Sequence, residues 1–159
     1  MLKVQIKSNW KWTTNVTITV RDLTGKVIDV KRYHNIVTTV GLAMIIDAFQ
    51  GTVTDCEIKY IAVGDDNTTP VIGDTTLVSE TFRKATTSFS EASSTSLETV
   101  CYIAPDEAVG QIEEIGWFAG TDAGAGADSG IMISRVLYSH DKSALESIQV
   151  ERTDTIAEA

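Results

Sequence analysis

The chain has 159 residues, enough for one domain with a sizeable hydrophobic core, and its two prolines and 43% hydrophobic content exclude a low-complexity chain. Its formal net charge of −9 disfavours a nucleic-acid partner, because phosphate contacts need clustered Lys and Arg. No apolar run approaches the roughly 20 residues of a membrane helix, and the start of the chain lacks the apolar stretch of a signal peptide, so we expect no membrane insertion.

The N-terminal segment alternates apolar and polar side chains over residues 1–7, as a strand with one solvated face does. Trp10 and Trp12 follow, two residues apart, and would share one face of an extended chain. Three roles are open for this pair: a lid over the edge of the fold, a subunit contact, or a stacking platform for a sugar.

Two alternating runs, residues 15–21 and 27–30, flank a turn in which Gly25 is free to adopt positive φ. They predict a β-hairpin. The short basic run at residues 31–34 is typical of a solvated strand end.

One segment has helical spacing of its apolar residues, which are Val40, Ala43, Met44, Ile46 and Ala48. Thr38 or Thr39 is suited to cap a helix near 38–49, and Gly51 is suited to end it. Gly41 lies inside this helix, where glycine costs roughly 1 kcal/mol relative to alanine. We therefore expect close packing at Gly41, with Leu42, Ile45 and Ile46 buried against a sheet.

The next run, residues 58–63, is β-branched and aromatic, ends at Gly64 and predicts a strand. A polar loop follows. Its Asp65, Asp66, Asn67 and Asp74 could suggest calcium, but their spacing matches no EF-hand loop. We expect these side chains to cap the loop's own backbone and expect no metal.

Long strands are predicted at 81–90 and 97–104, and the second is apolar on both faces, as a central strand is. Another strand covers residues 111–118, where the doubled Glu113 and Glu114 indicate a bulge. The small-residue segment 120–130 predicts a flexible loop, either disordered or ordered by a partner. No helix or lysine accompanies its glycines, which argues against phosphate binding.

The last strands are predicted at 131–138 and 145–151, and residues 152–159 either extend the final strand or form a tail. The expected fold class is mainly β, a single-domain, jelly-roll-like sandwich of about eight antiparallel strands with one α-helix. Its predicted parts are an N-terminal strand or arm (1–14), the sandwich (15–151) and a C-terminal tail (152–159).

Catalytic chemistry is not indicated. His34 and His140 lie in turn-like contexts, and the chain has no GxSxG motif. Cys56 and Cys101 belong to no CxxC pair, and two buried free thiols are favoured over a disulfide. We predict neither an enzyme nor a cofactor.

Several motifs recur in an order that resembles a family of tailed-bacteriophage virion structural proteins. They are a helix of the form N-x-V-x-x-x-G-L, a strand I-x-Y-I-A-x-G, and the later patterns D-T-x-L-x-x-E-x-x-R, I-x-E-I-G-x-F and R-V-x-Y. The resemblance covers roughly residues 33 to 152. Its most distinctive positions are Asn35, Gly41, Tyr60, Gly64, Asp74, Leu77, Glu80, Arg83, Glu114 and Gly116.

The resemblance implies a non-enzymatic virion component, assembled in the host cytoplasm, of the tail fibre, baseplate or an adaptor. A capsid decoration or head-fibre base is the alternative, and a host-glycan-binding module is an alternative of another class. Other virion proteins are the implied partners, and a homo-trimer or higher ring is the implied assembly. Trp10, Trp12 and Ile156 are the predicted interface residues, while Trp10, Trp12 and the 120–130 loop are the candidate surfaces for a glycan.

Overall fold

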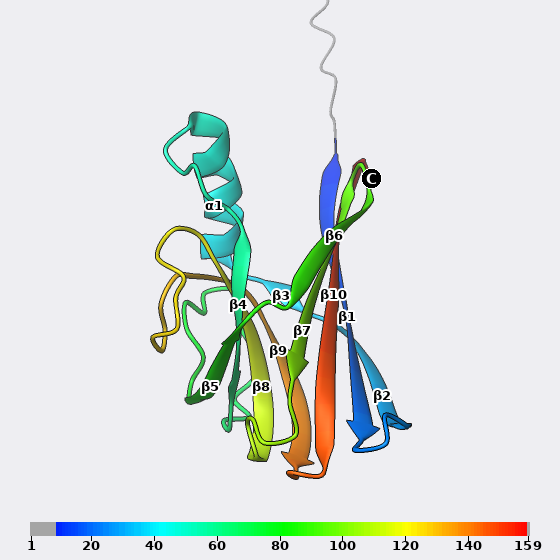
Figure 1. The fold of residues 1–159 in the computed structure, drawn as a ribbon. Helices are drawn as coiled ribbons and strands as arrows, with labels where there is room; N and C mark the ends of the chain where they lie inside the picture. Colours follow the sequence, from blue (N-terminus) through cyan, green and yellow to red (C-terminus); the bar gives the residue numbers. More distant parts are fainter. Residues whose placement is uncertain (1–8, 159) are drawn as a thin grey trace, which may run out of the picture.

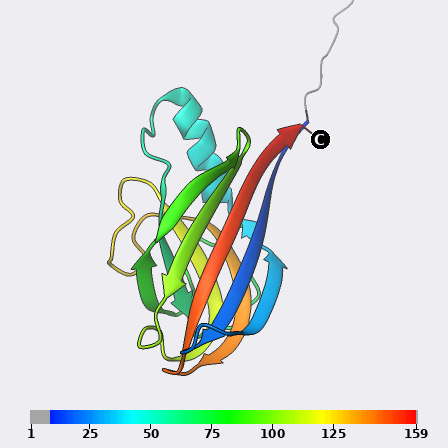
Figure 2. The same ribbon diagram turned by 45° about the vertical axis from the view of Figure 1, so that its right-hand side comes forward.

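The computed structural model describes residues 9–158 as a β-sandwich of two antiparallel five-stranded sheets with one helix (Figures 1 and 2). Sheet A contains, in spatial order, β2 (Val27–His34), β1 (Trp10–Asp22), β10 (Glu146–Glu158), β7 (Ser96–Ile103) and β6 (Ser88–Ser93). Sheet B contains β3 (Ile36–Val37), β9 (Ile131–Lys142), β8 (Gly110–Ala119), β4 (Ile58–Gly64) and β5 (Glu80–Ala85). The predicted fold class is confirmed, with ten strands in the described region.

The core lies between the two sheets, because alternate residues of each strand point inward. Its main members are Val16, Ile18, Val20, Ile61, Val63, Cys101, Ile103, Ile115, Trp117, Ile148 and Val150. A second, smaller cluster lies on the outer face of sheet B and contains Ala62, Leu77, Phe118, Ala123 and Met132. Sheet B is therefore buried on both faces, which accounts for its long apolar runs.

The predicted boundaries at residues 14 and 152 are wrong. Strands β1 and β10 pair continuously from Trp10 with Glu158 to Asp22 with Glu146, so residues 10–14 and 152–158 belong to the sandwich. The polar C-terminal residues are ordered because their backbone groups bond to β1 along this ladder. Residues 1–8 of the predicted arm, and residue 159, lie outside the described part of the chain.

The predicted single strand 81–90 is also wrong, because it is two strands in different sheets. The backbone N–H of Thr86 donates to Lys59 of β4 (2.8 Å), whereas that of Thr87 donates to Val100 of β7 (2.7 Å). Adjacent residues are thus bonded to opposite sheets, and the chain crosses the sandwich between them. Three other predictions are confirmed: the hairpin of β1 and β2, the interior position of β7, and a register shift beside Glu113.

The predicted helix is confirmed as α1 (Thr39–Gln50). The Thr38 side chain accepts a hydrogen bond from the N–H of Gly41 (3.0 Å) and donates one to the carbonyl of Met132 (2.5 Å). Gly51 ends the helix in the left-handed conformation, with φ of 74°. The β8–β9 register skips Ile133, whose carbonyl accepts the N–H of Thr38 (3.0 Å). This irregularity in β9 therefore anchors the start of the helix.

Gly41 makes the close contact with sheet B that its position inside the helix predicts. A Cβ atom on this residue would lie 2.8 Å from both the Cα and the carbonyl oxygen of Ile133. These are backbone atoms of an interior strand, which cannot move aside as a flexible side chain could. Glycine is required here because the helix begins directly against the sheet.

The predicted burial of Leu42 and Ile46 is wrong: the two side chains are 37% and 47% exposed. Met44 is buried and Ile45 half-buried, so this side of α1 makes the contact. Figures 1 and 2 show the reason, since α1 rises past the end of sheet B and stands beside the upper ends of β1, β6 and β10. Only part of the helix surface therefore has a sheet to pack against.

Gly41→Leu should destabilise the protein by about 1–3 kcal/mol, because the larger side chain forces α1 away from Ile133. Urea denaturation monitored by circular dichroism measures this change. Ala43→Leu, on an exposed position of the same helix, is the matched control and should change stability by less than about 0.5 kcal/mol. Equal stability of the two variants would refute the close approach.

Candidate functional site

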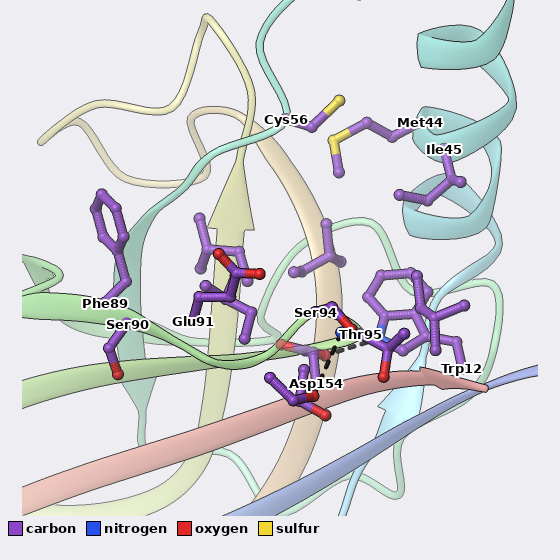
Figure 3. A pocket seen from close by; sticks show the side chains of 16 residues that line it. Trp12, Met44, Ile45, Cys56, Phe89, Ser90, Glu91, Ser94, Thr95 and Asp154 are labelled. Carbon is purple, nitrogen blue, oxygen red and sulfur yellow. Dashed lines mark hydrogen bonds between the residues drawn. The ribbon is translucent and has the colours of Figure 1, made fainter.

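An open groove lies between α1 and the part of sheet A that extends past sheet B (Figure 3). Its volume is about 860 Å³. Met44 and Ile45 line it from the helix, Phe89 and Glu91 from β6, and Ile156 from β10. The lining is predominantly apolar, and we refer to this space as the helix–sheet groove.

The floor of the helix–sheet groove is polar and tightly paired. The Arg152 guanidinium, fully buried, donates through Nε and Nη2 to the two carboxylate oxygens of Asp154, both at 2.7 Å. It also donates to the hydroxyl of Ser134 on sheet B and lies 5.2 Å from the ring centroid of Trp117. A bidentate pair of this kind fixes both side chains. The hydrogen bond from Arg152 to Ser134 then joins the two sheets where the apolar core ends.

Trp12 and Trp10 have different surroundings. The Trp12 indole N–H donates to Asp154 (2.8 Å), so this half-buried side chain covers the end of the core. That contact is the lid predicted for the pair. Trp10 lies two residues before Trp12, on the same face of β1, and is 51% exposed. Ile156 on β10 is 43% exposed. Trp10 and Ile156, like Trp12, are predicted interface residues, and that role stays a prediction.

The exposed side of α1 carries a second apolar feature. Leu42, Ile46 and Phe49 recur at the spacing of one helix face, and Phe49 is 80% exposed. We refer to these three residues as the helix stripe. Together with Trp10 and Ile156 it makes one end of the sandwich unusually apolar for a solvated surface.

The resemblance motifs meet in a different place, on the outer face of sheet B. Arg135 on β9 is 1% exposed and donates to Glu114 (2.6 Å), to Asp74 (2.9 Å) and to the carbonyl of Thr68 (2.8 Å). Glu114 in turn accepts the N–H of Ser79 (2.9 Å). These contacts bind the loop at residues 65–79 onto the sheet.

Two glycines of the motifs make this packing possible. A Cβ on Gly64 would collide with Glu114 and with the backbone of Ser79, and one on Gly116 would lie 2.9 Å from Leu77. Leu77 is consequently buried, at 4% exposure, between the loop and the sheet. These motif residues therefore attach the 65–79 loop to sheet B.

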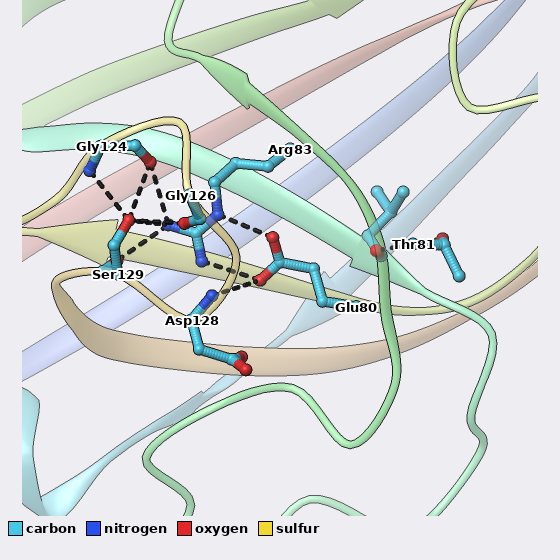
Figure 4. A network of polar contacts seen from close by, with 8 residues as sticks. Glu80, Thr81, Arg83, Gly124, Gly126, Asp128 and Ser129 are labelled. Carbon is cyan, nitrogen blue, oxygen red and sulfur yellow. Dashed lines mark hydrogen bonds and ion pairs between the residues drawn. The ribbon is translucent and has the colours of Figure 1, made fainter.

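Glu80 and Arg83 form a second attachment (Figure 4). Their side chains make two 2.8 Å contacts with each other, and Arg83 also donates to the carbonyl of Ser129 (2.8 Å). Its guanidinium lies 3.9 Å from the ring centroid of Phe118. The 120–130 loop is thus ordered by its own chain, which corrects the prediction that it is disordered or ordered by a partner.

The two remaining motif residues, Tyr60 and Asn35, lie in different surroundings. Tyr60 on β4 is half-buried against the outer cluster. Asn35 lies between β2 and β3, and its amide oxygen and nitrogen are buried with no hydrogen-bond partner in the described chain.

Two of the four loop side chains that were predicted to cap the backbone, Asp66 and Asp74, do so. Asp66 accepts the N–H of Thr68 (2.7 Å), and Asp74 accepts that of Val71 (3.0 Å). Within residues 9–158, no three His, Cys, Asp or Glu side chains gather in a way that could hold a metal ion. Cys56 and Cys101 are free thiols, as predicted; Cys101 is buried, whereas Cys56 is half-buried at the helix–sheet groove.

The fold and its site define a two-sheet β-sandwich with an apolar groove at one end. No family model, curated protein or solved structure matches the chain. None of the helices in the described residues has the length and apolar character needed to span a membrane.

Sequence reasoning missed most of the groove. Arg152 and Asp154 lie in a segment for which the sequence leaves a tail or an extension of the final strand open, and Phe89 and Glu91 fall in a predicted strand and a predicted connector. The only available signal was the i, i+2 spacing of Arg152, Asp154 and Ile156, which matches that of the two tryptophans. Paired strands with equal spacing present such residues on one face.

Arg135→Met should destabilise the protein by about 3–5 kcal/mol, because it leaves Glu114 buried without its counter-charge. Urea denaturation measures the loss, and hydrogen exchange should show the amides of Val78 and Ser79 exchanging faster. Arg32→Met, at an exposed position of β2, is the matched control and should change stability by less than about 0.5 kcal/mol. Similar effects from both substitutions would show that the Arg135 contacts do not hold the 65–79 loop on the sheet.

The two thiols should differ in reactivity. Burial raises the pKa of the Cys101 thiol to about 12, so almost no thiolate forms there at pH 8. Iodoacetamide at that pH should modify one thiol per native chain, at Cys56, and two after unfolding, as read by intact mass. Cys56→Ser should abolish the native reaction. Modification of Cys101 in the folded protein would show that the core is less closed than described.

Proposed function

We propose that this protein is a non-enzymatic structural component of a tailed-bacteriophage virion, belonging to the tail fibre, baseplate or an adaptor between them. The observation that carries the proposal is the concentration of apolar surface at one end of the sandwich, in the helix–sheet groove and the helix stripe. Soluble monomers rarely leave contiguous apolar surface of this kind exposed, whereas subunits of an assembly cover it.

The motif residues support the same proposal. Arg135, Glu114 and Asp74 are committed to one another, as are Glu80 and Arg83, so these acids and bases hold loops in place. Charged pairs that hold loops in place make the fold rigid, and a subunit of a particle that bears mechanical load needs a rigid fold. The motif-level resemblance to virion proteins points to the same role.

Two other placements belong to the proposal as alternatives. A capsid decoration or head-fibre base would use the same apolar end against a different virion protein. A host-glycan-binding module would use Trp10, whose exposed ring is the available stacking surface. The 120–130 loop is held against sheet B by Arg83 and lies on the opposite side of the molecule from the start of β1, which carries Trp10 (Figure 1).

The proposal predicts a homo-oligomer, a trimer or larger ring, since apolar edges and faces favour closed symmetric assemblies. Light scattering after size-exclusion chromatography at tens of micromolar should give a mass of three or more chains. Immunogold labelling of intact phage particles should then place the protein on the tail. A monomer in solution together with unlabelled particles would contradict the proposal, and binding on a glycan array would favour the third alternative.

A further inference from the structure

We propose that residues 1–8 of one copy bind in the helix–sheet groove of a second copy, as a strand added to the outer edge of β6. The inference concerns how copies join, and it goes beyond a role in the virion. It therefore stands or falls independently of the proposed function.

The sequence of the segment suits the groove. Leu2, Val4 and Ile6 alternate with Lys3, Gln5 and Lys7, which gives an extended chain one apolar and one polar face. The three apolar side chains span about 13 Å along a strand. The groove that would receive them, at about 860 Å³, is lined by Met44, Ile45, Phe89 and Ile156.

The edge of sheet A supplies the backbone partner. Within residues 9–158, β6 is bonded to β7 on one side and to no strand on the other. An open edge next to an apolar groove is the arrangement in which proteins accept an extended segment, because the backbone bonds give affinity and the groove takes alternate side chains. Residues of β6 line the groove, so one added strand would use both features.

Charge also favours this pairing. The segment contains two of the thirteen basic residues of the chain and none of its twenty-two acidic residues. A lysine on the polar face of the added strand is thus attracted to a surface that is acidic overall.

Distance identifies a second copy as the donor. The segment joins its own chain at β1, and β10, β7 and β6 lie between β1 and the open edge. Four strand spacings amount to about 19 Å, which takes about six residues of extended chain. Residues 3–8 would be used in that span, so Val4 and Ile6 could not pair with β6 of their own chain. The donor must therefore enter from outside, which makes the contact directional between copies.

Disulfide capture in the full chain tests the proposal. Leu2→Cys, Val4→Cys and Ile6→Cys place a thiol on the apolar face, near the native Cys56 at the groove. Lys3→Cys and Gln5→Cys place it on the opposite face as matched controls. Under mild oxidation, at least one of the first three should form an interchain disulfide with Cys56 roughly tenfold faster than either control, because docking raises the effective thiol concentration. Cys56→Ser should abolish it.

The outcomes separate the possible occupants. Non-reducing gels that show dimers or ladders support exchange between copies. A crosslink confined within one chain would overturn it in favour of the chain's own segment. The absence of crosslinks, or equal rates for both faces, would also overturn it, since the groove of the purified protein would then await a different partner.

A substitution in the groove provides a second, independent readout. Ile156→Glu should weaken self-association at least tenfold in sedimentation measurements, while the exposed position leaves the fold intact by circular dichroism. Leu145→Glu, at an exposed apolar residue before β10 at the far end of the ladder, is the control and should leave association unchanged. If the protein assembles with equal affinity in both variants, residues 1–8 do not bind the groove of a second copy. The proposed role as a virion component would be unaffected.

Discussion

The continuous ladder between β1 and β10 is the constraint on which the rest of the structure depends. Thirteen residue pairs make these strands longer than the sheet they face, so the inner surface of sheet A continues beyond the core. Beyond the core, the inner surface of sheet A no longer has sheet B to pack against. The bidentate pair of Arg152 and Asp154, sealed by Trp12, ends it with a polar layer, because a buried charge is tolerated when its hydrogen bonds are satisfied. Beyond this layer the sheet is apolar again, and α1 stands opposite.

The helix occupies its position through one backbone contact and one cap. Gly41 lets the first turn touch Ile133, and Thr38 bonds both to the helix and to β9. After the contacts of Met44 and Ile45 with the core, the rest of the helix projects past sheet B (Figure 1). The groove and the helix stripe are therefore consequences of where the helix is anchored, and the anchor is specified by two residues. The loops on the opposite face follow a similar logic, with Arg135 and Arg83 each joining a distant segment to the sheet.

Local patterns in the sequence were sufficient for the fold class, the hairpin, the helix with both caps, and the close packing at Gly41. They failed wherever a distant residue decides the outcome. Thr86 and Thr87 carry no turn signal, yet their amides bond to different sheets. The 120–130 loop has a flexible composition but is fixed by Arg83, about forty residues earlier in the chain. The C-terminal residues look like a solvated tail because Arg152 and Asp154 occupy inward positions that an apolar pattern would fill. Leu42 and Ile46 predicted burial because an apolar helix face normally has a covering partner, and here the described chain provides none.

We propose that the helix–sheet groove and the open edge of β6 form a contact between copies. Hydrogen exchange of the full chain at low and high protein concentration tests it most directly, since an added strand protects the amides that it binds. If copies join in this way, the amides of β6, between Ser88 and Ser93, should exchange more slowly at the higher concentration. Those of the loop at 65–79, bound by Arg135 on the other side of the molecule, should be unchanged. Equal exchange of β6 at both concentrations, in a protein that light scattering shows to be assembled, would contradict the claim.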